Sequence, residues 1–213
     1  MDFIDEEIEK YALTHSSKEN DLLYDLNRQT HLNILQPRML SGHLQGRFLS
    51  MMSKALSPNS ILEIGTYTGY SALCLAEGLS SKGSLVTIDK NIELEEFAKS
   101  YFKKSSYKSN IKMIIGDAIS IIPTLKNTWD LVFIDADKEN YSNYFDLVID
   151  NVRPGGWIIA DNVLWSGKVL NDTKANDLET KSLKLFNTKV HTDNRVTNML
   201  LPIRDGLMIL IKN

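Results

Sequence analysis

Three oxygen-bearing side chains stand directly after two apolar runs in the second half of the 213-residue chain. Asp135 follows the run 131–134, and Asp161 and Asn162 follow the run 157–160. If the two runs are neighbouring parallel strands, their carboxyl ends bring these side chains together. Carboxylate and amide oxygens are hard ligands that suit Mg²⁺, Mn²⁺ or Ca²⁺ better than zinc. The alternative is that Asp135 caps a helix and the other two belong to an ordinary loop, and the trio alone does not decide between these interpretations.

A glycine loop earlier in the chain predicts a site for a small ligand with polar groups. The sequence I-L-E-I-G-T-Y-T-G begins with an apolar run at 61–64, turns at Gly65 and Gly69, and continues with apolar residues at helical spacing. A strand, loop and helix in this order leave free N–H groups at the helix start and let a ligand approach closely. Three residues separate the glycines, which departs from the G-x-G-x-x-G pattern of dinucleotide sites, so a nicotinamide cofactor is not expected. Packing alone is the other explanation of the two glycines.

The loop also carries the first resemblance to a known class. Glu63 and the two glycines form the pattern E-x-G-x-x-x-G, and Asp89 ends the next apolar run. This arrangement resembles class I methyltransferases, which use S-adenosylmethionine. The carboxylate of Asp89 suits a ribose, because it can accept hydrogen bonds from both hydroxyls. Asp117 follows a further apolar run, so an acid or amide ends almost every expected strand at one edge of the sheet.

Alternating strand and helix patterns predict the sheet that would position these residues. Strands are expected at 61–64, 84–89, 111–115, 131–134, 157–160, 191–201 and 207–211, with a turn at 154–156 and a polar loop at 163–176. Helices are expected at 2–13, 20–31, 42–56, 72–79, 93–105, 118–125, 141–151 and 178–187. The gap 202–206 is too short for a crossover helix, so the last two strands should be antiparallel. We therefore expect a mostly parallel seven-stranded α/β sheet with one antiparallel strand near the C-terminus and helices on both faces.

The composition is typical of a soluble globular protein, with 43% hydrophobic and 24% charged residues. The net charge of −3 gives no overall attraction to nucleic acid. No apolar run approaches the roughly 20 residues of a membrane span, and the acidic start lacks a signal-peptide core. The single cysteine, Cys74, suits a reducing compartment, so we expect a cytoplasmic protein. Residues 1–41 are expected to form a helical cap over a single catalytic domain at 42–213.

Three motifs make the resemblance more specific. V-F-I-D-A-D-K-E-N-Y, G-G-W-I-I-A-D-N-V-L-W and L-P-I-R-D-G-L resemble the cation-dependent O-methyltransferases, the family of caffeoyl-CoA and catechol O-methyltransferases and their bacterial relatives. The order and spacing of the motifs match from about Met39 to the C-terminus. The resemblance implies a Rossmann-like class I methyltransferase fold and a homodimer.

The resemblance also implies roles for individual residues. Asp135, Asp161 and Asn162 would hold the cation, with Mg²⁺ expected first and Mn²⁺ or Ca²⁺ as alternatives. Lys138, three residues after the first metal aspartate, would act as the base, with Asp135 beside it in the catalytic group. Cofactor contacts are implied for Ser41, Glu63, Gly65, Thr66, Ser71, Asp89, Asp117, Ala118, Asp135 and Asp137. The chain has Ser166 where the plant caffeoyl-CoA enzymes carry a substrate-binding asparagine.

The expected activity is methyl transfer to a hydroxyl of a catechol-like small molecule. A phenol has a pKa near 10, and a divalent cation bound to two adjacent hydroxyls favours the phenolate and fixes its position. Lys138 could remove the proton if the cation and partial burial lower its pKa; otherwise it is a surface lysine at a helix start.

Two alternatives remain open at this stage. Methylation of a hydroxylated tRNA base would use lysine patches, for which the candidates are Lys99, Lys103, Lys104, Lys108, Lys181, Lys184 and Lys189. The other alternative is a non-catalytic nucleotide- or metal-binding module.

Overall fold

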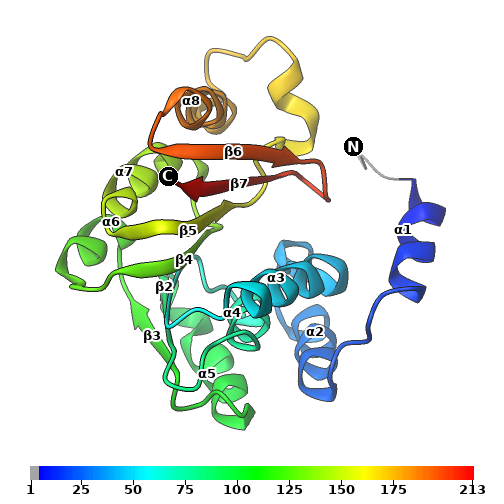
Figure 1. Ribbon diagram of the computed structural model, residues 1–213. Helices are drawn as coiled ribbons and strands as arrows, with labels where there is room; N and C mark the ends of the chain where they lie inside the picture. Colours follow the sequence, from blue (N-terminus) through cyan, green and yellow to red (C-terminus); the bar gives the residue numbers. More distant parts are fainter. Residues whose placement is uncertain (1–4) are drawn as a thin grey trace.

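The computed structural model describes residues 5–213, and within them a seven-stranded sheet forms the centre of the molecule (Figure 1). The strands are β1 (Ser60–Ile64), β2 (Ser84–Asp89), β3 (Ile111–Ile115), β4 (Trp129–Ile134), β5 (Val152–Ala160), β6 (Val196–Leu201) and β7 (Leu207–Lys212). Their order is β3-β2-β1-β4-β5-β7-β6. The first five strands are parallel, and β7 is antiparallel to both of its neighbours. The expected sheet, with one antiparallel strand near the C-terminus, is confirmed.

Helices cover both faces of the sheet (Figure 1). They are α1 (Glu6–Thr14), α2 (Asp21–Asn33), α3 (Gly42–Leu56), α4 (Tyr70–Ala76), α5 (Glu95–Lys104), α6 (Ala118–Ile121), α7 (Tyr141–Ile149) and α8 (Leu178–Thr192). In β4, Val132 and Ile134 join the core formed with α7 and α8, whereas Leu131 and Phe133 join the core formed with α2 to α5. Successive strand residues point to opposite faces, so a sheet covered on both sides needs the continuous apolar runs seen in the sequence.

Strand β5 differs from its prediction. It begins at Val152, not at Trp157, and it includes the residues 154–156 that were expected to form a turn before it. Val152 is paired with Trp129, and Trp157 is paired with Leu131, so the extra residues are accommodated as an irregularity in the ladder. The prediction was wrong because a β-bulge and a turn use the same glycine-rich sequence.

Helix α8 is longer than predicted, and the strand after it is shorter. The helix continues to Thr192, and β6 begins at Val196 rather than at residue 191. Leu183, Phe186 and Val190 are buried at helical spacing, so the apolar stripe of α8 extends beyond the predicted helix end. The expected polar loop at 163–176 contains a short 3₁₀ segment, Trp165–Leu170.

The two N-terminal helices lie before the sheet along the chain. Leu23 and Leu26 of α2 are buried in the core on the α3–α5 side, whereas α1 buries none of its residues. The part of the first predicted helix at 2–4 lies outside the described residues, and the division of the chain at residue 41 stays a prediction. Among the helices of the described chain, none is both long and apolar enough to cross a membrane.

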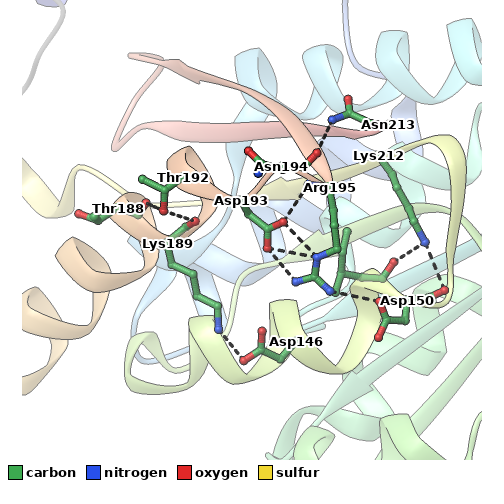
Figure 2. A network of polar contacts seen from close by, with 11 residues as sticks. Asp146, Asp150, Thr188, Lys189, Thr192, Asp193, Asn194, Arg195, Lys212 and Asn213 are labelled. Atoms are coloured by element: carbon green, nitrogen blue, oxygen red, sulfur yellow. Dashed lines mark hydrogen bonds and ion pairs between the residues drawn. The ribbon is translucent and has the colours of Figure 1, made fainter.

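Polar contacts anchor the C-terminal strand to the end of α7 (Figure 2). The Lys212 ammonium donates to the backbone carbonyls of Ile149 and Val152 at 2.8 and 2.7 Å. Arg195, just before β6, pairs with Asp150 at 3.2 Å. The contact with Ile149 satisfies a carbonyl that the end of α7 leaves free, and all three contacts hold β6 and β7 against the segment between α7 and β5.

Candidate active site

A cleft of about 1430 Å³ opens at the carboxyl ends of β1, β2, β4 and β5. Most of the residues implied by the resemblance line it, namely Ser41, Gly65, Asp89, Asp117, Ala118, Asp135, Asp137, Lys138, Asp161 and Asn162. Glu63, Thr66 and Ser71 are buried and do not line the cleft. The parallel sheet thus brings together residues from distant parts of the chain, as expected for the carboxyl edge of such a sheet.

Lys138 is the centre of a polar cluster in this cleft. Its side-chain ammonium donates to Asp135 Oδ1 at 3.0 Å, to Asn162 Oδ1 at 2.9 Å and to the Tyr141 hydroxyl at 2.7 Å. Asp161, next to Asn162, is 3% exposed and accepts a hydrogen bond from the side-chain amide of Gln45 at 2.5 Å. The two aspartates and the asparagine therefore lie together at the ends of adjacent strands, as the sequence predicted.

The pKa values of Asp161 and Lys138 depend on the charged groups around them. Burial, reinforced by the charge of Asp135, raises the pKa of Asp161 to about 7. Burial alone would lower the pKa of Lys138, but the neighbouring Tyr141 and Asp135 outweigh that effect and raise it above its usual value. The lowered pKa expected for Lys138 is therefore not supplied by the protein alone and would need a cation at the acids.

The donor set fits a hard divalent cation. Asp135 Oδ1 and Asn162 Oδ1 already converge on one positive charge, the Lys138 ammonium. Asn162 has a left-handed backbone, with φ of 59°, a conformation that asparagine tolerates better than most residues. Within residues 5–213 no group of three His, Cys, Asp or Glu residues is placed to hold a metal, so a site here would need the amide oxygen of Asn162 as a ligand.

Asp89 holds the glycine loop. Its Oδ2 accepts hydrogen bonds from the backbone N–H groups of Thr66 at 3.0 Å and Tyr67 at 2.7 Å, and its Oδ1 accepts one from Asn91. A carboxylate accepts about four hydrogen bonds, so Asp89 keeps capacity for about one more. The sequence suggested that Asp89 accepts hydrogen bonds from both ribose hydroxyls, which would need capacity for two more.

The two glycines of the loop have different neighbours. At Gly65, with φ of +99°, a Cβ atom would lie 1.8 Å from the Asp135 carbonyl oxygen, so only glycine lets β1 end beside β4 at the cleft. At Gly69, a Cβ atom would lie 2.6 Å from the ring of Phe102. Gly69 therefore serves helix packing, the alternative that the sequence left open, whereas Gly65 also lines the cleft.

Glu63 is a buried acid with an unused acceptor. Its carboxylate accepts a hydrogen bond from the Thr87 hydroxyl at 2.5 Å, but its Oε1 has no partner among residues 5–213. Burial raises its pKa to about 8. A buried polar atom without a partner is costly, and because Glu63 lies behind the residues that line the cleft, this oxygen does not by itself mark a ligand position.

Asp117 and Asp137 have structural partners in addition to their place in the cleft. Asp117 caps α6 by accepting from the Ile119 backbone at 3.1 Å, the role that the sequence gave as the alternative for such acids. Asp137 accepts from the Tyr144 hydroxyl at 2.7 Å. Neither contact uses all of the carboxylate's acceptor capacity.

Two neighbours of the cluster could not be found from sequence. The contact between Gln45 and Asp161 joins residues 116 positions apart, and no local pattern marks it. Trp165 lines the cleft with its ring centre 5.7 Å from the Lys138 ammonium and 5.5 Å from that of Lys168. Trp165 and Ser166 both have left-handed backbones, which turn this segment at the mouth of the cleft.

The strand order, the antiparallel β7, the glycine loop after β1 and the cleft at the carboxyl edge define a Rossmann-like class I methyltransferase. Comparison with known proteins gives the family. Residues 13–213 match the family model described as O-methyltransferase. The chain therefore belongs to the O-methyltransferase family, and it is an S-adenosylmethionine-dependent enzyme of the caffeoyl-CoA O-methyltransferase type.

Individual relatives agree with this assignment. The caffeoyl-CoA O-methyltransferase of Stellaria longipes is 30% identical, over 95% of this chain and 88% of its own. The crystal structure of the O-methyltransferase TomG from Streptomyces achromogenes, in complex with SAM, has a TM-score of 0.90 and 27% identity, covering 97% of this chain and 96% of TomG. The O-methyltransferase from Bacillus cereus, in complex with SAH, has a TM-score of 0.88 and 27% identity, covering 97% of each chain.

Proposed function

We propose that this enzyme transfers a methyl group from S-adenosylmethionine to one hydroxyl of a vicinal aromatic diol, with the help of a divalent cation held by Asp135, Asp161 and Asn162. The observation that carries the proposal is the convergence of Asp135 Oδ1 and Asn162 Oδ1 on a single positive charge in the cleft. Mg²⁺ is the expected cation, with Mn²⁺ or Ca²⁺ as alternatives, because all three ligands are hard oxygens.

The reaction needs a deprotonated acceptor oxygen held in line with the sulfonium methyl. A cation at the trio would lower the pKa of a bound hydroxyl and fix its position. Once a cation at the trio had lowered its pKa, Lys138 as the neutral amine would be placed to take the proton, and the Tyr141 hydroxyl lies within hydrogen-bond distance of the same nitrogen. The Trp165 ring offers a flat surface for the aromatic part of the acceptor.

The cofactor would lie on the β1–β2 side of the cleft. The remaining acceptor capacity of Asp89, which lines the cleft, supports this position. SAM and SAH, the ligands named for the TomG and Bacillus cereus structures, support the choice of cofactor. The proposed contacts are those implied by the resemblance, at Ser41, Glu63, Gly65, Thr66, Ser71, Asp89, Asp117, Ala118, Asp135 and Asp137.

The contacts of the lysines speak against the tRNA alternative. Lys181 donates to the Ala175 carbonyl at 2.7 Å, and Lys189 pairs with Asp146 at 2.5 Å. Lys99 pairs with Glu95 on its own helix. These three of the seven candidate ammonium groups already have acceptors within the chain, which leaves less positive charge available to a nucleic acid. Membership of the enzyme family likewise favours catalysis over a non-catalytic binding module.

Acceptor selectivity tests the proposal. Purified enzyme with S-adenosylmethionine and Mg²⁺ should methylate 3,4-dihydroxy aromatic compounds at least about 100-fold faster than their monohydroxy counterparts, because only a vicinal pair can chelate the cation. Equal rates on the two classes would show that chelation is not the basis of activation. Faster transfer to bulk tRNA than to any diol would favour the nucleic-acid alternative. The homodimer implied by the resemblance can be checked on the same preparation by light scattering.

A further inference from the structure

The Lys138 ammonium lies between the oxygens that the proposed function gives to a metal ion. It donates to Asp135 Oδ1 at 3.0 Å and to Asn162 Oδ1 at 2.9 Å, and the lysine is 6% exposed. A general base needs only to lie within hydrogen-bond distance of the proton that it takes. The ammonium instead bridges two of the proposed metal ligands, which is the arrangement of a bound cation.

One buried acid and one partly buried acid explain why a positive charge is held there. Asp161 is 3% exposed and the side chain of the neighbouring Asp135 is 23% exposed, so the two carboxylates are largely shielded from water and repel each other. The ammonium compensates this charge and donates to Asp135. The third acceptor of the ammonium is the Tyr141 hydroxyl, at 2.7 Å. This hydroxyl donates in turn to the Asp161 backbone carbonyl at 2.9 Å, so Tyr141 links the ammonium to the end of β5.

From these contacts we infer that Lys138 is the resident counter-ion of the acid cluster and exchanges places with the divalent cation. The inference rests on the proposed function, since it needs a cation at the trio. When the cation takes Asp135 and Asn162, the ammonium gives up both oxygens and keeps the Tyr141 hydroxyl as its anchor. The same side chain thus holds the site together before the metal binds and lies next to the acceptor hydroxyl afterwards.

Exchange has a consequence that a lysine acting only as a base would not have. The metal must displace a hydrogen-bonded ammonium, so Lys138 weakens metal binding. Hydrogen bonds to charged groups contribute about tenfold or more each to an equilibrium constant. Removal of Lys138 should therefore tighten the binding of a divalent cation, although it removes the proposed base.

Calorimetric titration of EDTA-treated enzyme with Mn²⁺ tests the exchange without measuring activity. For Lys138→Met, the Kd for Mn²⁺ should fall by about tenfold or more relative to the parent. Lys168→Met is the matched control, because Lys168 lines the same cleft and carries the same charge but contacts none of the three ligands. Its Kd should stay within about twofold of the parent, since exposed charges are screened.

Thermal unfolding supplies a second readout. In EDTA, Lys138→Met should unfold at a lower temperature than the parent, because two acids lose their counter-ion, and Mn²⁺ should raise its Tm more than it raises that of the parent. If Lys138→Met does not fold in EDTA, Lys138→Gln carries the same comparison, because its amide can still donate to Asp135.

The outcomes separate this inference from the proposed function. Unchanged or weaker Mn²⁺ binding in Lys138→Met, with clear binding to the parent, would overturn the counter-ion role and leave the metal site standing. An equal gain in affinity in Lys168→Met would also overturn it, because the effect would then be one of general charge. No Mn²⁺ binding to the parent or to Lys138→Met would overturn both.

Discussion

Asp161 is held by one side chain of α3 and by the backbone of Asn162. Gln45, on α3, is 1% exposed and donates its amide N–H to Asp161 Oδ2 at 2.5 Å. This bond fixes one carboxylate oxygen, and the Asn162 backbone N–H donates to the other, Oδ1, at 2.6 Å, so each oxygen keeps about one lone pair for another ligand. Groups that orient a metal ligand in this way control affinity although they do not touch the metal.

Replacement of Gln45 by Leu should therefore weaken metal binding while the fold persists. We expect a loss of about tenfold in Mn²⁺ affinity, measured by calorimetry, because Asp161 loses its fixed orientation. The Kd for S-adenosylmethionine should change little, which separates this positioning role from a general loss of structure. Unchanged Mn²⁺ affinity in a well-folded variant would show that Gln45 is only a packing residue.

The proposed role of Lys138 as a base predicts an effect on the rate of methyl transfer. Lys138→Met should lower kcat with a vicinal diol by about 100-fold or more, because it removes a positioned proton acceptor. The Kd for S-adenosylmethionine should stay close to that of the parent. A rate equal to the parent's at saturating metal would remove Lys138 from the chemistry.

At the scale of elements, hydrogen bonds to one carboxylate hold α3 against the end of α4. Glu77, directly after α4, accepts from Arg47 at 2.8 Å, from Ser50 at 2.6 Å and from Lys54 at 2.9 Å, all on α3. Burial alone would raise the pKa of Glu77, but these hydrogen bonds outweigh it and lower the pKa to about 2. This cluster fixes the helix that follows the glycine loop, on the side opposite the cleft lining.

The depressed pKa predicts a pH dependence of stability. Because the pKa of Glu77 in the folded chain, about 2, lies below its ordinary value of 4.5, its contribution is fully present above pH 4.5. The contribution is lost as the pH falls from 4.5 toward 2. Glu77→Gln should therefore lower the free energy of unfolding by about 2 kcal/mol at pH 7, and the difference from the parent should shrink in that acid range. Urea unfolding at a series of pH values measures this, and a difference that stays constant down to pH 3 would contradict it.

The elements also show what the sequence could predict. The bounds of α3, β2 and β3 agree with the prediction, because each has a clear periodicity and a glycine, proline or aspartate near its end. The start of β5 was missed because its bulge depends on pairing with β4, which the chain around 154–156 does not encode locally. The end of α8 was missed because the burial of Val190 depends on how the helix packs.

The candidate site was predictable to a similar extent. Asp135, Asp161 and Asn162 could be grouped because strand ends in a parallel sheet share an edge. Gln45 and Trp165 could not, because their contacts arise from helix and loop packing between segments far apart in sequence. The bridging position of Lys138 is likewise a property of the assembled cluster and not of its spacing from Asp135.

At the scale of the whole molecule, the last strand joins the antiparallel side of the sheet to the end of α7. Lys212 at the end of β7 donates to carbonyls at the end of α7 and the start of β5 (Figure 2). β7 also separates β5, which Asp161 directly follows, from the edge strand β6. The C-terminal residues therefore stabilise the fold far from the reacting groups.

Lys212→Met should lower the free energy of unfolding by about 1–3 kcal/mol, because it leaves backbone carbonyls without their donor. Lys108→Met, at an exposed lysine, is the control and should stay within about 0.5 kcal/mol of the parent. Methyl transfer per folded molecule should be unchanged in both. A large loss of kcat in Lys212→Met without a loss of stability would contradict a structural role.

The dependence of methyl transfer on a divalent cation tests the account most directly. The rate with a vicinal diol should vanish in excess EDTA and return on titration with Mg²⁺ or Mn²⁺. Asp161→Ala should lose about 100-fold or more of the activity, because a metal ligand and its charge are gone, and should still bind S-adenosylmethionine. Full activity in EDTA, or an Asp161→Ala enzyme as fast as the parent, would contradict the metal site.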